Sequence, residues 1–338
     1  MTDLNRQWIL RKRPSGPLTE DIFEWVQTPV PSPADGQALV RNLALSLDPA
    51  NRVWIAGPSY RPAVALDGPM DGFAIGQVVE SRDPSLRPGQ LVSGTLGWQD
   101  YACTPAAALR VVPELPNTPL SYHLGVLGVT GLTAYFGLLD VGRPKPHETV
   151  LVSGAAGATG SVVGQIAKMW GCPVAGIAGR PDKCAWLTDE LGFDAAIDYR
   201  NEDVGAAIDA AFPDGVDVYF DNVGGPLLEK VLTKMRRGGR IVCCGSVSDY
   251  DGTSPAPGPR GVPGLLVTRR LRMQGFIVLD YYGRADQAVK ALAGWIESGH
   301  LKVREDRIDG LEQAPRGLIG LLAGDNVGKR WVHVADPT

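Results

Sequence analysis

The sequence predicts an α/β protein in which a doubly wound parallel sheet is inserted into a smaller β-rich domain. Two observations support this fold class. Up to about residue 125 the chain is rich in proline and in short β-like runs, and from about residue 126 strands alternate with helical segments. After about residue 303 the pattern becomes extended again. We therefore expect residues 1–125 and 304–338 to form one domain and residues 126–303 to form the other.

The N-terminal region is predicted to be a small β-barrel or sandwich. Its β-like runs include Ala38–Asn42, Gly76–Glu80 and Gln90–Leu96. Turn signals of proline, glycine and aspartate separate them, at 33–36 and at 87–89. Short strands at regular spacing with this punctuation are typical of all-β domains.

The central region contains six apolar runs that predict the strands of the parallel sheet. They are Val150–Ser153, Val174–Ala178, Ala195–Asp198, Val216–Phe220, Arg240–Cys243 and Arg272–Val278. Helical spacing of apolar residues predicts helices between and after them, for example at Pro226–Met235 and Ala285–Ser298. In the tail, we expect extended segments at Lys302–Ile308 and Lys329–Val334 and a helix at Ala314–Leu322.

A glycine-rich turn joins the first of these strands to a helix. Gly154, Gly157 and Gly160 follow the strand directly. Glycines at such a turn let the backbone approach a pyrophosphate, and the next helix offers N–H groups and the positive end of its dipole. The strict G-x-G-x-x-G pattern is not matched, because Ala155 stands at its first glycine. A ligand-free turn would also explain the glycines, but the flanking strand, helix and second strand favour a dinucleotide site.

Basic residues follow the second predicted strand, in the segment Gly179-Arg180-Pro181-Asp182-Lys183. A carboxylate at this place would bind the ribose 2′-hydroxyl of NAD, whereas cations suit the 2′-phosphate of NADP. Solvated surface charges are the alternative interpretation of Arg180 and Lys183. Their place at the strand end favours NADPH as the cofactor and hence a reductase.

Two further loops lie at the ends of predicted strands, where ligands of open α/β sheets bind. The first is Asp221–Gly225 and the second is Cys244–Tyr250. A turn that serves only backbone geometry is an equally good interpretation of Asp221. Tyr250 adds a phenol to the second loop, and we interpret the cysteine pair at 243–244 as small apolar residues rather than nucleophiles.

Composition excludes several classes of protein. The formal net charge of −4 gives no basic surface for nucleic acid, no apolar run reaches the ~20 residues that span a bilayer, and the first residues have no signal-peptide segment. The five cysteines contain no C-x-x-C pair, which indicates reduced thiols and argues against structural zinc. We therefore expect a cytoplasmic protein without a metal, a membrane or a nucleic-acid partner. A covalent hydrolase is disfavoured because no G-x-S-x-G elbow is present.

Taken in order, the motifs resemble the zinc-independent medium-chain dehydrogenase/reductases. The similar branch holds the prostaglandin reductases (leukotriene B4 12-hydroxydehydrogenases), the alkenal double-bond reductases and the bacterial NADPH-dependent curcumin reductases. The matching stretches run from near the N-terminus to the end of the chain. They are LSLDP (45–49), GLTAYFGLL (131–139), SGAAGATGSVVGQIAKMWG (153–171), YFDNVGG (219–225), CGSVSDY (244–250), LRMQGF (271–276) and DGLEQAPRGLIGLLAGDNVGK (309–329).

This resemblance implies a GroES-like β-barrel catalytic domain built from both ends of the chain, with a Rossmann-type NADPH domain inserted. It also implies a homodimer and NADPH-dependent reduction of the C=C bond of small hydrophobic α,β-unsaturated ketones and aldehydes. Three groups of residues would bind the cofactor. Those implied for the pyrophosphate are Ala158, Thr159, Gly160 and Ser161, and those implied for the 2′-phosphate are Lys183 and Tyr199. The remaining implied positions are Asn222, Cys244, Gly245, Ser246, Val247, Ser248, Tyr250, Phe276, Ile277, Val278 and Asn326.

The chain also departs from the family pattern. Ala50 stands where many members have a tyrosine, and residues 254–257, Ser-Pro-Ala-Pro, lack a phenol that some members carry. Three other phenols are the candidate catalytic donors to the substrate carbonyl: Tyr60, Tyr250 and Tyr282. A quinone oxidoreductase on the same fold is the alternative enzyme, and an NADPH-binding sensor with weak catalysis is the alternative class.

Overall fold

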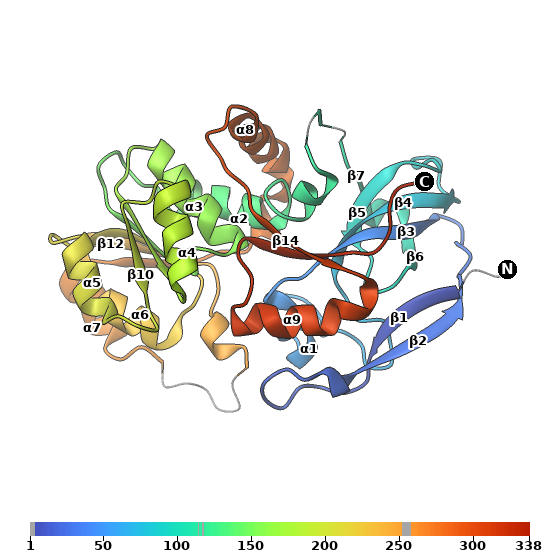
Figure 1. Cartoon of the computed structure of the whole chain (residues 1–338), viewed down its shortest axis with the longest axis horizontal. Helices are drawn as coiled ribbons and strands as arrows, with labels where there is room; N and C mark the ends of the chain where they lie inside the picture. The colour runs from blue at the N-terminus through green and yellow to red at the C-terminus, as the bar shows by residue number, and fades with distance from the viewer. Residues whose placement is uncertain (1–3, 114, 117, 252–257) are drawn as a thin grey trace. The chain divides into compact units, whose positions relative to one another are not determined.

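The computed structural model describes residues 4–113, 115, 116, 118–251 and 258–338, and the chain divides into two compact units. The terminal unit comprises Met1–Gly125, Glu305–Asn326 and Arg330–Thr338. The central unit comprises Val126–Arg304 and Val327–Lys329. Figure 1 shows the elements of each unit coloured along the chain.

The central unit is built on a parallel sheet with the strand order β10-β9-β8-β11-β12-β13. The strands are β8 (Val150–Ser153), β9 (Val174–Ala178), β10 (Ala195–Asp198), β11 (Val216–Asp221), β12 (Met235–Cys243) and β13 (Arg272–Gly275). The chain starts in the middle of this sheet and runs outward in both directions, so the order reverses between β8 and β11. The crevice at the carboxyl ends of such a pair is the usual ligand site of an open α/β sheet.

Helices cover both faces of the parallel sheet. On one face α5 (Val204–Ala211), α6 (Gly225–Leu232) and α7 (Val262–Arg269) share an apolar cluster with the strands. The other face carries α2 (Val129–Phe136), the π-helical segment η4 (Gly137–Gly142), α3 (Ala158–Met169) and α8 (Ala285–Glu297). Shorter segments complete the unit: α4 (Pro181–Ala185), η5 (Trp186–Glu190), η6 (Val247–Asp249) and η7 (Val278–Arg284). The sheet is therefore doubly wound, as predicted.

Three predicted boundaries in this unit are wrong by three residues or more, and one of them is the strand predicted from Arg240, which begins at Met235. The strand predicted to reach Val278 ends at Gly275, and Val278 begins the 3-10 helix η7. The helix predicted to reach Met235 ends at Leu232, and Met235 already begins β12. The first half of β12 passes through exposed positions 237 and 238 and therefore carries no apolar signal.

The terminal unit is an antiparallel β structure with strands from both ends of the chain. A seven-stranded sheet has the order β14-β15-β3-β4-β5-β7, with β6 beside β3. Its strands are β3 (Gln37–Ser46), β4 (Phe73–Ser81), β5 (Leu91–Thr95), β6 (Tyr101–Pro105), β7 (Arg110–Val111), β14 (Glu305–Asp309) and β15 (Lys329–His333). A hairpin of β1 (Leu4–Leu10) and β2 (Phe23–Pro29) lies beside it and is joined by isolated bridges.

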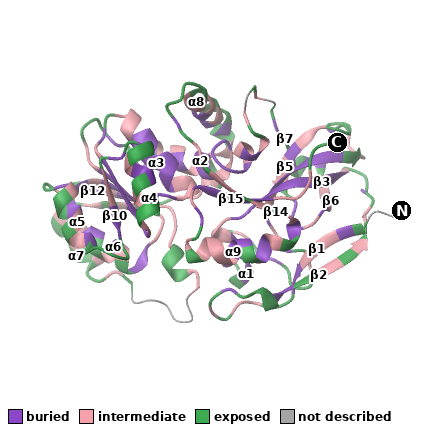
Figure 2. Ribbon diagram, in the orientation of Figure 1, coloured by how far each residue is buried: buried purple, intermediate pink, exposed green. Residues whose placement is uncertain are grey.

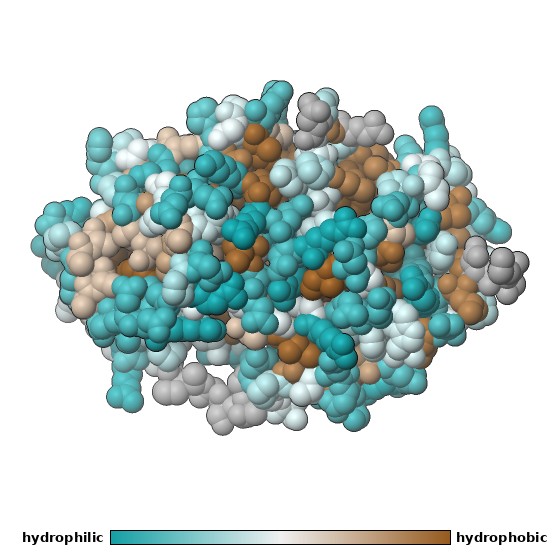
Figure 3. Space-filling model, viewed as in Figure 1, coloured by the Kyte–Doolittle hydropathy of each residue, from teal (hydrophilic) through white to brown (hydrophobic). Residues whose placement is uncertain are grey.

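Two helices, α1 (Ala50–Ala56) and α9 (Ala314–Ala323), pack on the core of the terminal unit. Trp54 of α1 and Leu318 of α9 belong to the same buried cluster as the sheet residues. Short 3-10 segments complete this unit: η1 (Glu20–Ile22), η2 (Ala106–Ala108), η3 (Leu120–Leu124) and η8 (Leu311–Gln313). Figure 2 shows buried residues concentrated along the strands, and Figure 3 shows a mainly hydrophilic face.

Candidate functional site

The turn between β8 and α3 forms a tight cradle at the carboxyl edge of the parallel sheet. Gly154 has φ +57°, a left-handed conformation that favours glycine. A Cβ at Gly160 would lie 2.4 Å from the carbonyl oxygen of Gly154, so the first turn of α3 closes on the loop only without a side chain. The first N–H groups of α3 precede its hydrogen-bond ladder and remain available to a ligand. A pyrophosphate fits this combination of close backbone and free N–H groups.

The alanine that breaks the strict glycine pattern has a structural explanation. Ala155 is fully buried, and its N–H donates to the carbonyl oxygen of Ile177 on β9 at 3.0 Å. A Cβ at Gly176 would lie 2.8 Å from the Cβ of Ala155. The side chain at 155 is therefore accommodated by a missing side chain on the neighbouring strand.

The predicted 2′-phosphate residues follow the ends of β9 and β10, which are neighbouring strands. Ala178 and Asp198 are register partners, so the residues that follow them emerge side by side. A Cβ at Gly179 would lie 2.7 Å from the Tyr199 ring, which shows that this ring rests on the glycine backbone. Lys183 lies one turn further on in α4 and is 9% exposed.

Asp221 organises the loop after β11. Its carboxylate is 1% exposed, and Oδ1 accepts hydrogen bonds from the hydroxyls of Ser153 (3.1 Å) and Tyr219 (2.8 Å) and from the N–H groups of Val223 and Gly224. Burial raises the pKa of this carboxyl, and the hydrogen bonds oppose the shift. Asp221 thus stabilises the turn after β11, which agrees with the interpretation of this residue as part of a turn that serves backbone geometry.

Asn222 is oriented by the end of β8. Its side-chain amide donates to the carbonyl oxygen of Ser153 at 2.7 Å, and its backbone N–H donates to the Ser153 hydroxyl at 2.9 Å. The side chain is therefore held across the β8–β11 crevice, where the strand order reverses.

The segment Cys244–Tyr250 docks on the same loop. Cys244 and Gly245 donate their N–H groups to the carbonyl oxygen of Asp221 at 2.9 and 3.1 Å. Ser248 donates through both its N–H and its hydroxyl to the carbonyl oxygen of Val223. In this way the loops after β11 and β12 form one hydrogen-bonded unit.

The four cysteines of the central unit are poor nucleophiles. Burial raises the pKa values of three thiols to about 11, those of Cys172, Cys184 and Cys243. It raises the pKa of the Cys244 thiol to about 12. Very little thiolate is present at neutral pH, in agreement with the interpretation of the 243–244 pair as small apolar residues.

The predicted residues Phe276, Ile277 and Val278 link β13 to η7 and are half-buried. The Phe276 ring meets that of Phe220 edge-on, with 6.5 Å between their centroids. A Cβ at Gly137 would lie 2.5 Å from Phe276 and 2.8 Å from Phe220, so this glycine makes room for both rings.

The three candidate phenols are divided between the two units. Tyr250 and Tyr282 belong to the central unit and Tyr60 to the terminal unit. Tyr282 packs on the apolar cluster around α2 and α8, and Tyr250 follows η6. The remaining predicted cofactor residue, Asn326, is buried within the terminal unit. The segment 254–257 lies outside the described residues.

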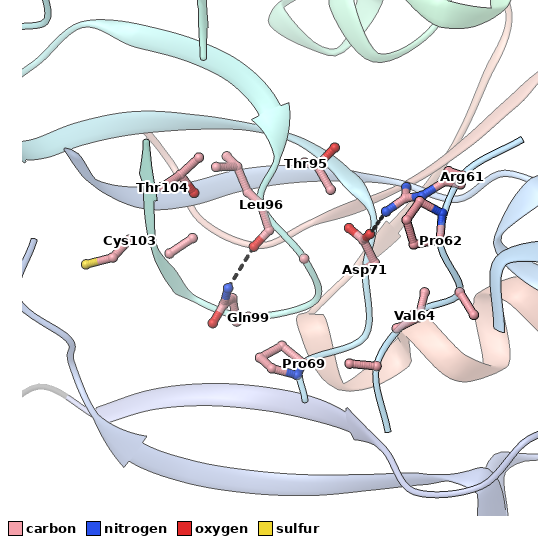
Figure 4. Close-up of a pocket in the computed structure, with 14 residues that line it drawn as sticks. Arg61, Pro62, Val64, Pro69, Asp71, Thr95, Leu96, Gln99, Cys103 and Thr104 are labelled. Carbon is pink, nitrogen blue, oxygen red and sulfur yellow. Dashed lines mark hydrogen bonds and ion pairs between the residues drawn. The ribbon is translucent and has the colours of Figure 1, made fainter. Parts of the chain in front are cut away.

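Tyr60 stands in a polar cluster that the sequence did not reveal. Its hydroxyl accepts a hydrogen bond from Trp54 Nε1 at 2.7 Å, and burial raises the pKa of the phenol. The Arg61 guanidinium lies 4.6 Å from the centroid of the Trp54 ring and forms an ion pair with Asp71. Figure 4 shows this pair at the edge of a cavity of about 320 Å³ within the terminal unit. These residues are distributed over 54–71, and no sequence spacing indicates that they meet.

Metal ligands do not gather in the described part of the chain, where no three His, Cys, Asp or Glu side chains are placed to hold an ion. Among the same residues, no helix is both long and apolar enough to cross a bilayer.

Comparisons with known proteins agree with this architecture. A family model described as the N-terminal domain of oxidoreductase matches residues 6–112, and one described as zinc-binding dehydrogenase matches residues 158–296. The chain is 42% identical over 336 residues to the NADPH-dependent curcumin reductase of Escherichia coli, covering 98% of this chain and 97% of that protein. It is 40% identical over 341 residues to the NADP(+)-dependent 2-alkenal reductase of Nicotiana tabacum, covering 98% of each.

Solved structures give the same result. The crystal structure of CurA in complex with NADPH from Vibrio vulnificus matches with a TM-score of 0.93 and 40% identity, covering 98% of this chain and 100% of that one. A quinone oxidoreductase of Escherichia coli shares the fold with a TM-score of 0.78, but its 21% identity carries no further inference.

The Rossmann-type sheet, together with these relatives, defines an NADP-linked oxidoreductase. The chain belongs to the zinc-independent medium-chain dehydrogenase/reductases, in the branch that holds the curcumin, alkenal and prostaglandin reductases.

Proposed function

We propose that this protein is an NADPH-dependent reductase of the C=C bond of small hydrophobic α,β-unsaturated ketones and aldehydes. The observation that carries the proposal is similarity over nearly the whole chain, at 40% identity or more, to reductases named for curcumin and 2-alkenals. The phosphate cradle and the basic edge of the sheet support NADPH as the cofactor.

In the proposed site, the first turn of α3 (Ala158–Ser161) holds the pyrophosphate, while Lys183 and Tyr199 hold the 2′-phosphate. Asn222, the segment Cys244–Tyr250, the backbone at Phe276–Val278 and Asn326 complete the contacts. Bound NADPH supplies a hydride for the β-carbon of the substrate. The protein provides orientation, charge and exclusion of water.

Phenols are the proposed donors to the substrate carbonyl oxygen. Tyr60, Tyr250 and Tyr282 each carry a hydroxyl that can donate a hydrogen bond. A donor at the carbonyl stabilises the negative charge that develops there when the β-carbon accepts hydride. We expect Tyr→Phe at the true donor to lower kcat while leaving NADPH binding unchanged. If all three variants turn over normally, phenol assistance is wrong.

A screen of NADPH oxidation over enones and enals graded by size and aromaticity tests the function. Higher kcat/KM for enones than for benzoquinones supports the proposal, and the reverse order supports a quinone oxidoreductase. Tight NADPH binding without oxidation across the whole panel supports a sensor.

Lys183→Glu tests the cofactor assignment. We expect a rise in KM for NADPH of at least ten-fold and little change in KM for NADH, because the glutamate carboxylate would repel the negatively charged 2′-phosphate. Lys290→Glu, an exposed position on α8, is the matched control and should change neither value. Equal effects of Lys183→Glu on both cofactors would remove Lys183 from the 2′-phosphate site.

We also propose a homodimer in the cytoplasm. β13 stands at the end of the strand order, and nearby Val267 and Leu279 are 74% and 42% exposed, a combination that suits strand pairing with a second copy. Val267→Asp should shift the mass measured by light scattering toward the monomer, whereas Val79→Asp in the terminal unit should not. Wild-type protein that is monomeric at micromolar concentration would contradict the dimer.

Recovery of the protein outside the cytoplasmic fraction would contradict the location.

A further inference from the structure

Arg200 occupies a rigid turn directly after β10. The Asp198 carboxylate, 5% exposed, accepts the N–H of Arg200 at 3.1 Å and the side-chain amide of Asn201 at 2.8 Å. The Asp198 carbonyl oxygen accepts the N–H groups of Asn201 and Glu202. A side-chain carboxylate that caps its own turn in this way fixes the backbone from which the Arg200 side chain leaves.

The Arg200 side chain extends over the exposed ring of Tyr199. Its guanidinium carbon lies 5.8 Å from the ring centroid, within the range of a cation–π contact. A hydrogen bond with Tyr199 is the main cause that raises the pKa of Arg200 above its ordinary value. Since Tyr199 rests on Gly179, the cation is held above the ends of both β9 and β10.

The other arginine at this edge is already engaged. Arg180 contacts both carboxylate oxygens of Asp182, through Nε at 2.9 Å and through Nη2 at 2.8 Å. A bidentate pair of this kind uses the fork that a phosphate would need. A ligand at Arg180 would therefore have to displace Asp182.

We propose that Arg200 is a specificity-determining residue for the 2′-phosphate, in addition to Lys183 and Tyr199. This inference rests on the proposed NADPH-dependent function and adds to it the residue that supplies a planar, bidentate donor. A phosphate dianion matches the guanidinium fork in geometry, whereas the Lys183 ammonium acts as a point charge. The ribose 2′-hydroxyl of NADH offers no charge to Arg200, so the residue discriminates between the two cofactors.

Calorimetric titration with 2′,5′-ADP and with 5′-AMP tests the assignment without turnover. We expect Arg200→Ala to weaken 2′,5′-ADP binding about 5–20-fold, the lower part of the range for a charge-assisted pair because the site is exposed to solvent. Binding of 5′-AMP should change less than two-fold. Arg200→Lys should recover part of the loss, since it keeps the charge without the fork.

Arg237→Ala, at an exposed position on β12, is the matched control and should bind both ligands as the wild type does. Equal losses for the two ligands would show that Arg200 only supports the turn, and no loss would show that it does not meet the phosphate; either result overturns the assignment. If the wild-type protein itself fails to prefer 2′,5′-ADP over 5′-AMP, the NADPH-dependent function is wrong and not Arg200 alone.

Discussion

Replacing Gly160 by alanine perturbs the phosphate cradle at a single atom. The added Cβ would lie 2.4 Å from the carbonyl oxygen of Gly154 and 2.8 Å from the Cα of Ala155. Both are backbone atoms, so no side-chain rotation relieves the overlap. The turn has to open by about 1 Å to restore ordinary contact, and overpacking of this kind costs about 1–3 kcal/mol.

Alanine also favours a helix over glycine by about 0.5–1 kcal/mol, so we expect a net loss of up to about 2.5 kcal/mol. At roughly 2–4 °C for each kcal/mol, the melting temperature should fall by up to roughly 10 °C. Because the first N–H groups of α3 move with the turn, NADPH affinity measured by calorimetry should fall by at least about ten-fold, the size of one lost charge-assisted contact.

Gly294→Ala on α8 is the control for this substitution. Its added Cβ meets nothing within 4 Å, and its backbone is helical, so the same change should stabilise by about 0.5–1 kcal/mol and leave the affinity unchanged. If Gly160→Ala melts as high as Gly294→Ala, or binds NADPH as tightly as the wild type, Gly160 does not close the cradle.

Three further predictions concern the central unit. Burial raises the pKa of Glu148, but its hydrogen bonds with Arg240 and the Lys145 N–H outweigh burial and leave the pKa lowered. Glu148→Gln should therefore cost about 1–2 kcal/mol in urea unfolding at pH 7 and progressively less as the pH falls below 4.5, the ordinary pKa; an equal cost at pH 3.5 would refute the pairing. Gly137→Ala should displace the Phe276 ring and weaken NADPH binding, and an unchanged Kd would contradict this. The four thiols with pKa values near 11 and 12 should react with iodoacetamide at pH 7.5 about 100-fold more slowly in native than in unfolded protein, as mass spectrometry can follow at each site.

The buried strands of the central sheet were predictable because they are buried on both faces and therefore read as short apolar runs. The strands β8, β9 and β10 have the predicted bounds. The exposed first half of β12 carries no such signal, whereas the apolar residues Phe276–Val278 continue the signal beyond the end of β13 at Gly275. The predicted boundaries were wrong at both places. Helix α1 escaped prediction since its seven residues are shorter than the period analysis needs.

The candidate site was predictable only where its residues share a loop or a strand end. The family resemblance implied Lys183 and Tyr199 for one phosphate, and the segments that hold them follow β9 and β10, whose ends lie side by side. The contact of Tyr60 with Trp54, and that of Arg61 with Asp71, depends on how α1 and the following chain fold back. Periodicity and motif spacing in the sequence therefore do not predict these contacts.

The exception in the glycine pattern shows what the pattern measures. The glycine fingerprint reflects a close approach between the turn and the backbone next to it. It places all the residues without side chains in the turn itself. Here Ala155 keeps its Cβ, and Gly176 on β9 lacks one at the same point of contact. The same exchange recurs where Gly179 receives the Tyr199 ring. The physical requirement is a total volume shared between neighbouring segments, so an alanine in the turn is compatible with a dinucleotide site whenever the adjacent strand provides the space.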